Sequence, residues 1–237
     1  MKNRKLNFIL AILLPIQWLL IQSVSTKSSF IENYYSLGLY PYIARFSRII
    51  FGWLPFSIGD LFYILLGIII IKSIIRIIKT RKIKFLKIIV NISIIYFFFH
   101  LLWGFNYFRE PLQKSLQISS TDYTTEELEV FTHQLINKVN HLQIIITHID
   151  TLKVEIPHSK KDIYIKVENG YSKLSQELAH FDYKSPSIKN SLISLPLTYM
   201  GFSGYLNPFT GEAQVNSLNP MVSYPVTSCH EVAHQLG

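Results

Sequence analysis

The sequence has little charge and almost no cysteine. Only 16% of its 237 residues are charged, and Cys229 is the single cysteine. One cysteine excludes a disulfide within the chain, so cysteine usage leaves the redox compartment open. Acidic residues are scarcest in the first 105 positions, which hold Glu32 and Asp60 against 13 lysines and arginines. A segment so basic and so densely apolar is typical of membrane proteins.

The charge is divided unevenly along the chain. Residues 1–105 carry a net +11 (13 basic, 2 acidic) and residues 106–237 carry −3 (10 basic, 13 acidic), which together give +8. Nucleic-acid binding is disfavoured, because no basic stripe falls on the acidic, soluble-looking half. We therefore expect a membrane domain over residues 1–105 and an extracytoplasmic domain over residues 106–237.

Three apolar runs approach the roughly 20 residues that a helix needs to cross a bilayer. They are Leu6–Ile21, Leu61–Ile78 and Ile88–Phe105. Lys72 and Arg76 interrupt the second run near its end, where long basic side chains can extend to the headgroups. The runs predict three transmembrane helices.

Basic residues predict the orientation of these helices. Seven lysines and arginines and no acidic residue lie from Lys72 to Lys87, so this link should be cytoplasmic. The chain after Asn106 would then lie outside, as in a multi-pass protein of the cytoplasmic (inner) membrane. The first run also resembles a signal peptide with small residues at positions 23–25, although its length and Trp18 favour a retained helix. The aromatic-rich stretch at positions 34–60 predicts a re-entrant or surface-lying segment without chemistry of its own.

The outer half begins with two predicted helices. Thr124 and Glu127 have capping-box spacing, and the apolar residues that follow recur at three- and four-residue steps, which predicts about five helical turns. These residues are Leu128, Phe131, Leu135, Val139, Leu142 and Ile146. A second stripe, interrupted by Gly170, predicts another helix. It consists of Ile163, Val167, Tyr171, Leu174 and Leu178. Both stripes are interpreted as core-facing.

Short apolar stretches broken by proline and glycine follow at positions 191–217. Turn signals at Asn207-Pro208 and Thr210-Gly211 predict a β-hairpin. Pro196 limits its own run to an edge strand, because proline donates no ladder hydrogen bond. Such a strand beside the last helix could align an extended peptide. The expected fold class is α+β, with three N-terminal transmembrane helices followed by a mostly helical domain and a short hairpin.

The last eleven residues, TSCHEVAHQLG, contain the chemically most informative pattern. His230 and His234 are four residues apart, so on a helix both imidazoles lie on one face and can bind the same ion. Zinc would acidify a water molecule there, and Glu231 would take its proton as it attacks a carbonyl. The pattern therefore predicts Zn²⁺ as cofactor, the two histidines as metal ligands and Glu231 as the catalytic base.

Other interpretations of these residues stay open. The histidines could be ordinary surface residues, since composition alone yields such a pattern in roughly one chain in a hundred. Ser228 and Glu231 also have capping-box spacing, which would engage the carboxylate at the helix start; if Glu231 is a base, Thr227 is the expected N-cap. Cys229 is expected to be a small buried side chain rather than a ligand. His133, His141 and His148 are interpreted as a solvated face, and His100 as interfacial or packed.

Four blocks of sequence carry a resemblance that covers essentially the whole chain. They are PFSIGD (Pro55–Asp60), WGFNYFR (Trp103–Arg109), PFTGEAQVN (Pro208–Asn216) and HEVAHQLG (His230–Gly237). The chain resembles a family of bacterial three-span membrane proteins, a domain of unknown function that is grouped by motif with zincin-type metallopeptidases. The resemblance implies a zincin-like outer domain, zinc ligands at His230 and His234, Glu231 as base, and a third, acidic ligand after Gly237. A longer His-Glu-x-x-His-x-x-Gly-x-x-His pattern would place a histidine there instead.

These features predict a membrane-anchored zinc metallohydrolase, a peptidase whose partners are the lipid bilayer and a peptide or protein substrate. Two rivals remain: a non-catalytic membrane protein that keeps the metal or the fold to bind a partner, and an envelope scaffold without metal. The motif supplies two ligands, whereas zinc sites use three or four. Residues 1–237 alone are therefore expected to bind zinc weakly and to hydrolyse nothing.

Overall fold

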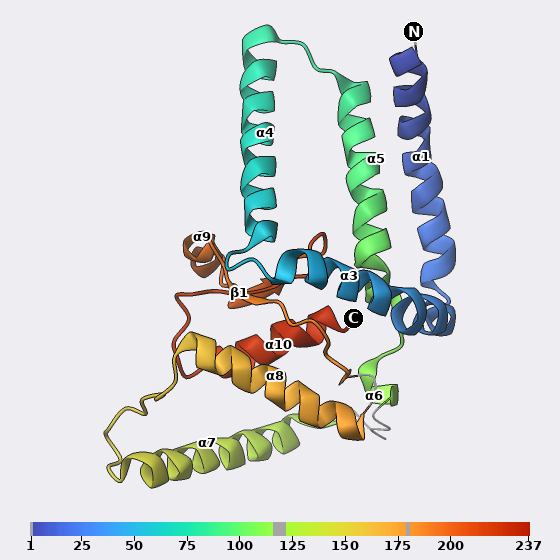
Figure 1. The fold of residues 1–237 in the computed structure, drawn as a ribbon. Coiled ribbons are helices and arrows are strands. Elements are labelled where there is room, and N and C mark those ends of the chain that lie inside the picture. The colour runs from blue at the N-terminus through green and yellow to red at the C-terminus, as the bar shows by residue number, and fades with distance from the viewer. Residues whose placement is uncertain (1, 116–121, 179–180) are drawn as a thin grey trace.

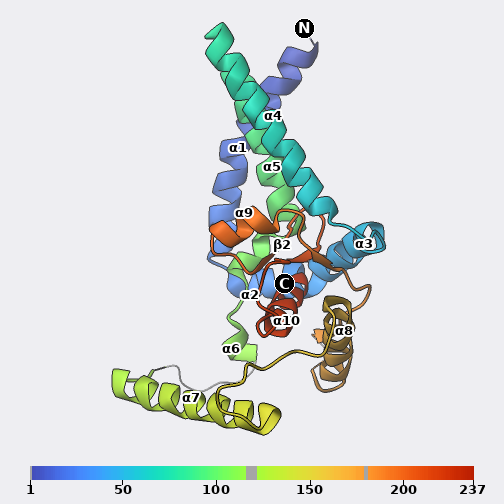
Figure 2. The ribbon, with the colours of Figure 1, turned by 90° about the vertical axis from the view of Figure 1, so that its left-hand side faces the viewer.

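The computed structural model describes residues 2–115, 122–178 and 181–237 (Figure 1). The chain is mostly helical, with one small sheet among the described residues. Three long helices, α1, α4 and α5, stand on one side, and the other elements lie across or beyond their ends (Figures 1 and 2). In chain order the elements are α1 (Lys2–Ser25), α2 (Ser28–Phe30), η1 (Ile31–Leu39), α3 (Tyr40–Gly52), α4 (Ile58–Thr80), α5 (Phe85–Leu102), η2 (Gly104–Phe108), α6 (Leu112–Ser115), α7 (Thr125–Thr147), α8 (Lys160–Glu177), β1 (Ile188–Asn190), α9 (Ser194–Tyr199), β2 (Gly204–Leu206), β3 (Ala213–Val215) and α10 (Tyr224–Gln235).

Within the described residues, three helices are long and apolar enough to cross a membrane: α1, α4 and α5. They contain the three predicted runs, with one correction. The third helix ends at Leu102 rather than Phe105, because the backbone of Trp103 leaves the helical region (φ −157°) and the short 3-10 helix η2 follows. α1 packs along α5, whereas α4 stands apart from that pair in Figure 1.

The aromatic-rich segment between the first two long helices lies across their ends, as a surface-lying segment would (Figure 1). It begins with η1, a π-helix, and continues as α3, which has a proline in its first turn. Tyr40 and Arg48 of α3 are buried. Their side chains point to α10, a contact that local sequence patterns did not suggest.

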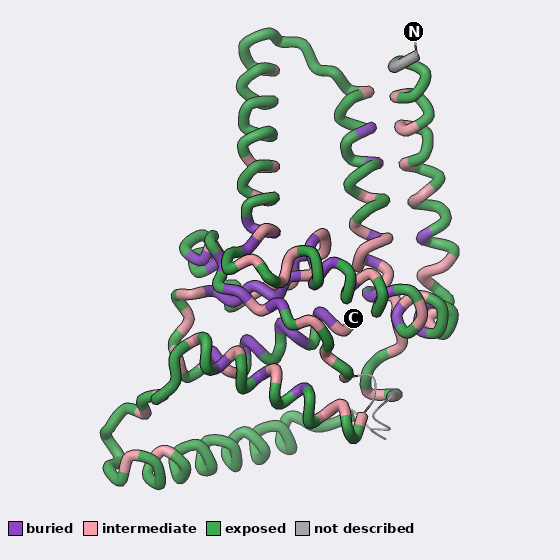
Figure 3. The backbone as a smooth tube through the Cα atoms, viewed as in Figure 1, coloured by how far each residue is buried: buried purple, intermediate pink, exposed green. Residues whose placement is uncertain are grey.

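Only one of the two outer helices has its apolar stripe in a core. Thr124 and Ser159 begin α7 and α8 with capping boxes. The core between α8, β3 and α10 consists of Ile163, Val167, Tyr171, Val215, Tyr224 and Val232. The structure describes all of α7, and none of its residues is buried. This helix lies on the side away from α1, α4 and α5 (Figures 1 to 3). The prediction that its stripe faces a core is wrong, because helical spacing gathers apolar residues on one face without supplying a partner for that face.

The predicted hairpin is formed by β2 and β3, which pair antiparallel with Gly204 opposite Val215. The Asn207 N–H donates to the Glu212 carbonyl oxygen (2.9 Å) across the turn. The Asn207 side-chain oxygen accepts hydrogen bonds from the two backbone N–H groups at positions 209 and 210. β1, which was not predicted, pairs parallel with β3, so the strand order is β1-β3-β2 and β2 lies at an edge.

Pro196 lies in the first turn of α9, so its assignment to an edge strand is wrong. Proline is tolerated there because first-turn N–H groups have no partner within the helix. The Ser191 hydroxyl accepts a hydrogen bond from the Ile193 N–H (3.2 Å) and the Ser194 hydroxyl donates to the Ser191 carbonyl oxygen (2.6 Å). These local bonds turn the chain into a helix where the hydrophobic pattern suggested a strand.

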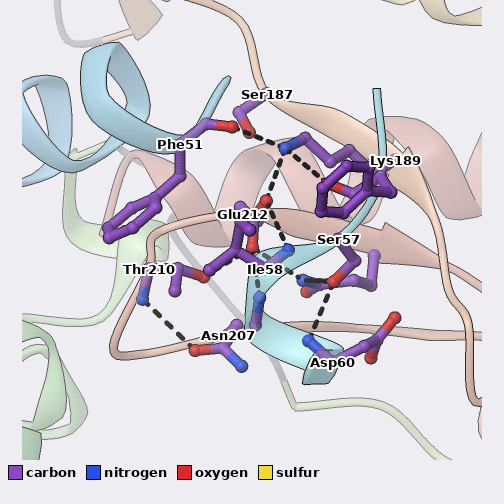
Figure 4. Close-up of polar contacts among 12 residues, drawn as sticks. Phe51, Ser57, Ile58, Asp60, Ser187, Lys189, Asn207, Thr210 and Glu212 are labelled. Atoms are coloured by element: carbon purple, nitrogen blue, oxygen red, sulfur yellow. Dashed lines mark hydrogen bonds and ion pairs between the residues drawn. The ribbon is translucent and has the colours of Figure 1, made fainter. Parts of the chain in front are cut away.

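A buried ion pair joins the hairpin to the start of α4 (Figure 4). The Glu212 side chain is fully buried, and Oε1 lies 2.5 Å from the Lys189 Nζ. The same carboxylate accepts hydrogen bonds from the backbone N–H groups of Ile58 (3.2 Å) and Gly59 (2.6 Å) and from the Thr210 hydroxyl (2.8 Å). A carboxylate at a helix N-terminus satisfies unpaired N–H groups and interacts favourably with the helix dipole. The sheet is therefore attached directly to a long apolar helix.

Lys189 and Asp60 extend this attachment. The Lys189 ammonium also donates to the carbonyl oxygens of Phe51 (2.6 Å) and Phe56 (3.0 Å), in the link between α3 and α4 (Figure 4). Asp60, in the first turn of α4, accepts a hydrogen bond from the Leu192 N–H (2.7 Å). Both charged side chains thus bind backbone groups of segments distant in sequence, and this network holds the end of α4 against the sheet.

Candidate functional site

α10 carries the His-Glu-x-x-His pattern and begins earlier than predicted, at Tyr224. A proline lies in its first turn, where the missing N–H is harmless. The Thr227 and Ser228 hydroxyls donate to the carbonyl oxygens four residues back, of Ser223 (3.1 Å) and Tyr224 (2.7 Å). Thr227 is therefore not the N-cap, and the capping box between Ser228 and Glu231 is also wrong. The Glu231 carboxylate lies in the body of the helix.

The two histidines face each other across one turn of α10. Their Nε2 atoms are 3.0 Å apart, and their rings are nearly perpendicular, at 89°. In a tetrahedral zinc site with Zn–N distances of about 2.0–2.1 Å, two ligand nitrogens are about 3.3 Å apart. The observed separation of 3.0 Å is close to this value, so His230 and His234 would need only a small adjustment to share one ion. Burial, and then the nearby His230, lower the pKa of His234. The lower pKa favours the neutral imidazole that metal binding requires.

Glu231 lies beside the histidine pair and is only 4% exposed. Among the described residues, its buried Oε2 atom has no hydrogen-bond partner. Burial raises the pKa of the Glu231 carboxyl to about 7. A carboxylic acid with a pKa in this range both accepts and releases protons near neutral pH. An unpaired buried carboxyl is unfavourable for folding, and such groups gather at functional sites.

The edge strand β2 passes directly over Glu231. A methyl group added at Gly204 would lie 2.7 Å from the Glu231 Oε1 atom and 2.8 Å from the Gln214 carbonyl oxygen. A real Cβ atom essentially never comes this close to another atom, so glycine lets the strand approach the carboxylate without a clash. The strand and the carboxylate are thereby held in one fixed arrangement.

The three motif residues line a cleft of about 500 Å³. The other walls come from β2 with its flanking residues, from the ends of α4 and α5 nearest the sheet, and from η2. The aromatic residues of this lining are Tyr63, Phe99, Trp103, Tyr107, Phe202 and Tyr205. A larger cavity, about 580 Å³, lies between α8 and the part of α10 that carries Cys229, and its walls do not include the motif. Cys229 is exposed, so the prediction that it is buried is wrong.

The end of α10 is held by side chains from the first half of the chain. The Trp103 indole N–H donates to the His234 carbonyl oxygen (3.0 Å). The Tyr40 hydroxyl and the Arg48 guanidinium both donate to the Gln235 carbonyl oxygen (3.1 and 3.0 Å). The last carbonyls of a helix lack partners within it and interact favourably with cations. The aromatic-rich segment, to which sequence analysis assigned no chemistry, therefore positions the helix that carries the histidines.

The four sequence blocks meet around α10 and the hairpin. The first block, PFSIGD, supplies the N-terminus of α4, where the Gly59 N–H donates to the Glu212 carboxylate of the third block. The second block supplies Trp103, whose indole N–H donates to the His234 carbonyl oxygen of the fourth. Residue Lys189 lies outside all four blocks, and its role was not predicted. Across the described residues, no group of three or more His, Cys, Asp or Glu side chains could hold a metal ion. The predicted metal ligands therefore remain His230 and His234, with no third candidate among these residues.

Four other histidines lie where they were expected. Those at positions 133, 141 and 148 are exposed, in keeping with a solvated face. His100 is buried near the end of α5, and its ring contacts those of Tyr96, Phe99 and Phe105. It is therefore a packed histidine rather than part of the cleft.

Fold and site define a helical protein with three helices able to cross a membrane and a small sheet-containing domain at their ends, with paired histidines and a buried glutamate in one cleft. The chain belongs to the family described as "Protein of unknown function (DUF3810)", whose model matches residues 35–237. The match confirms the expected membership of a family of unknown function. No curated protein and no solved structure matches the chain. The family description names no activity, so zinc binding and peptidase activity stay predictions.

Proposed function

We propose that this protein is a membrane-anchored, zinc-dependent hydrolase that cleaves peptide bonds. The observation that carries the proposal is the arrangement in the cleft: the Nε2 atoms of His230 and His234 are 3.0 Å apart, and the buried Glu231 carboxyl adjoins them. The two histidines would hold the ion. When bound, zinc would acidify a water molecule and polarise a carbonyl group.

Glu231 is placed to move the protons of the reaction. As the oxygen of water bonds to the peptide carbonyl carbon, its proton passes to the Glu231 carboxylate. The carboxyl then gives that proton to the amide nitrogen as the C–N bond breaks. The second proton of the water also passes to the leaving amine, so one water is consumed and a carboxylate and a protonated amine leave. The lack of a competing hydrogen bond at Oε2 among the described residues supports this role.

The edge strand β2 would hold the substrate. Among the strands that the structure describes, β2 pairs with β3 alone, and Gly204, Tyr205 and Leu206 line the cleft. An extended peptide can add to such an edge through main-chain hydrogen bonds, which bind a peptide with little dependence on its sequence. The close approach of Gly204 to Glu231 would then bring the peptide backbone to the carboxylate.

Zinc binding is tested by removing one histidine at a time. We expect His230→Ala and His234→Ala each to weaken zinc binding to the full-length protein by at least about 100-fold, since changes to groups that merely support a ligand already cost 10–100-fold. Affinity is measured by competition with a chromophoric chelator. His141→Ala, on the exposed face of α7, is the matched control and should bind zinc like the unaltered protein. Unchanged affinity in both α10 variants would contradict the proposed metal site.

The proposed location is the cytoplasmic membrane, with the C-terminal domain outside the cytoplasm. The basic link between α4 and α5 supports it, because such links stay cytoplasmic. A reporter enzyme that is active only outside the cytoplasm should be silent when fused after Lys82 and active when fused after Tyr123. We expect activities that differ by at least about tenfold after correction for expression. The reverse pattern would place the domain in the cytoplasm.

A further inference from the structure

The cleft is built partly from helices able to cross a membrane. Tyr63 lies five residues after the start of α4, and Phe99 lies three residues before the end of α5. At 1.5 Å per residue, these positions are about 8 Å and about 5 Å inside the helix ends. Both side chains line the cleft together with Glu231. The walls of the site therefore continue into the ends of two apolar helices.

On the α4 side, Tyr205 of the edge strand β2 contacts two side chains of the helix. The Tyr63 ring stacks on the Tyr205 ring of β2, with centroids 5.9 Å apart and planes at 27°. The Tyr205 hydroxyl donates to the buried Asp60 carboxylate in the first turn of α4. A peptide lying along β2 would therefore lie beside the end of α4.

On the α5 side, aromatic residues connect the helix end to the histidines. The Trp103 ring meets the Tyr107 ring edge-on (4.8 Å, 89°) and lies 6.3 Å from the His234 ring. Tyr107 also contacts Phe99 of α5. Tryptophan and tyrosine favour the boundary between hydrocarbon and water. The cleft thus has aromatic side walls at the depth where a membrane surface would lie.

The chemistry of the lining favours a polypeptide over a lipid headgroup. None of the described residues that line the cleft is a lysine or arginine, and phosphate recognition relies on such cations. The lining instead combines an open strand edge, apolar and aromatic side chains, and the motif residues. These groups fit the backbone and side chains of an extended polypeptide.

We propose, on the basis of the proposed function, that the substrate is a membrane-anchored polypeptide that enters the cleft sideways, between the ends of α4 and α5. The anchor is an apolar helix or an acyl chain, and the scissile bond lies in the extended stretch next to it. Only Gly59 and Asp60 of α4 are buried, and α4 stands apart from the α1–α5 pair (Figure 1). Membrane anchoring of both partners would raise their effective concentration.

The first test compares anchored and free forms of one substrate. A random-sequence mixture of quenched-fluorescence peptides is prepared with an acetyl group, a palmitoyl chain or an apolar helix of about 20 residues at the N-terminus. The full-length protein in phosphatidylcholine vesicles should cleave both anchored forms at least about 100-fold more efficiently than the acetylated form. A soluble protease added to identical vesicles measures how much of each peptide is accessible. Equal efficiencies after this correction would overturn the inference and leave the peptidase proposal standing.

The second test detects binding without turnover. In the Glu231→Gln variant, the photoreactive residue benzoylphenylalanine replaces Phe99, which lines the cleft. The matched control carries it at Phe98, the exposed neighbouring residue on α5, which does not line the cleft. Anchored peptides should cross-link from position 99 at least about tenfold more than from position 98, whose direction differs by about 100°. Cross-linking only to phospholipid, or equally from both positions, would overturn the inference. Selective cross-linking without cleavage by the unaltered protein would support this entry route and overturn the peptidase proposal.

Discussion

Replacing Glu231 by glutamine is expected to lower peptide hydrolysis by the full-length protein at least about 100-fold, because a positioned general base contributes 10²–10⁴ to such rates. Glutamine has nearly the same shape, but it cannot take a proton from water. The amount of zinc bound per chain should stay unchanged, since the proposed ligands are His230 and His234. The measurements are the cleavage of a quenched-fluorescence peptide mixture and the zinc content of the same preparations.

A matched control separates the role of Glu231 from that of burial. Glu168 on α8 is a half-buried carboxyl whose pKa burial likewise raises, and it lies outside the cleft. Glu168→Gln should retain the activity of the unaltered protein. Full activity in Glu231→Gln would rule out this carboxylate as the base. Loss of zinc together with activity would mean that Glu231 supports the metal site and does not act in proton transfer.

Glu212→Gln is expected to lower the free energy of unfolding by about 3–5 kcal/mol, the usual effect of breaking a buried ion pair. The change leaves the Lys189 ammonium, whose side chain is 5% exposed, without a negative partner. It also removes the negative charge at the N-terminus of α4, where the Glu212 carboxylate accepts two backbone hydrogen bonds. Urea unfolding in a mild detergent, followed by tryptophan fluorescence, measures the change.

Two further variants show whether the pair itself is responsible. Lys189→Met combined with Glu212→Gln removes both charges and should be more stable than Glu212→Gln alone, because no unpaired charge is then buried. Glu129→Gln alters a side chain that is 71% exposed on α7 and should change stability by less than about 0.5 kcal/mol. If Glu212→Gln falls within the same range, the ion pair does not hold the sheet to α4.

Features that depend on neighbouring residues could be predicted from the sequence. Long apolar runs define the three helices able to cross a membrane, because their length must match a bilayer. The capping box at Thr124 and the hairpin turn at Asn207 are satisfied by bonds to residues a few positions away. The four-residue spacing placed His230 and His234 on one face of a helix.

Features that depend on distant residues were decided by the tertiary structure. The apolar stripe of α7 has ordinary helical spacing, yet the described residues leave all of it unburied, whereas the similar stripe of α8 is covered by β3 and α10. The contact between Lys189 and Glu212, and the approach of Gly204 to Glu231, join segments with no shared local pattern. The same holds for the cleft, whose walls include α4 and α5. Periodicity states which face of an element is apolar; only the folded chain determines what that face meets, because packing depends on the positions of all the elements together.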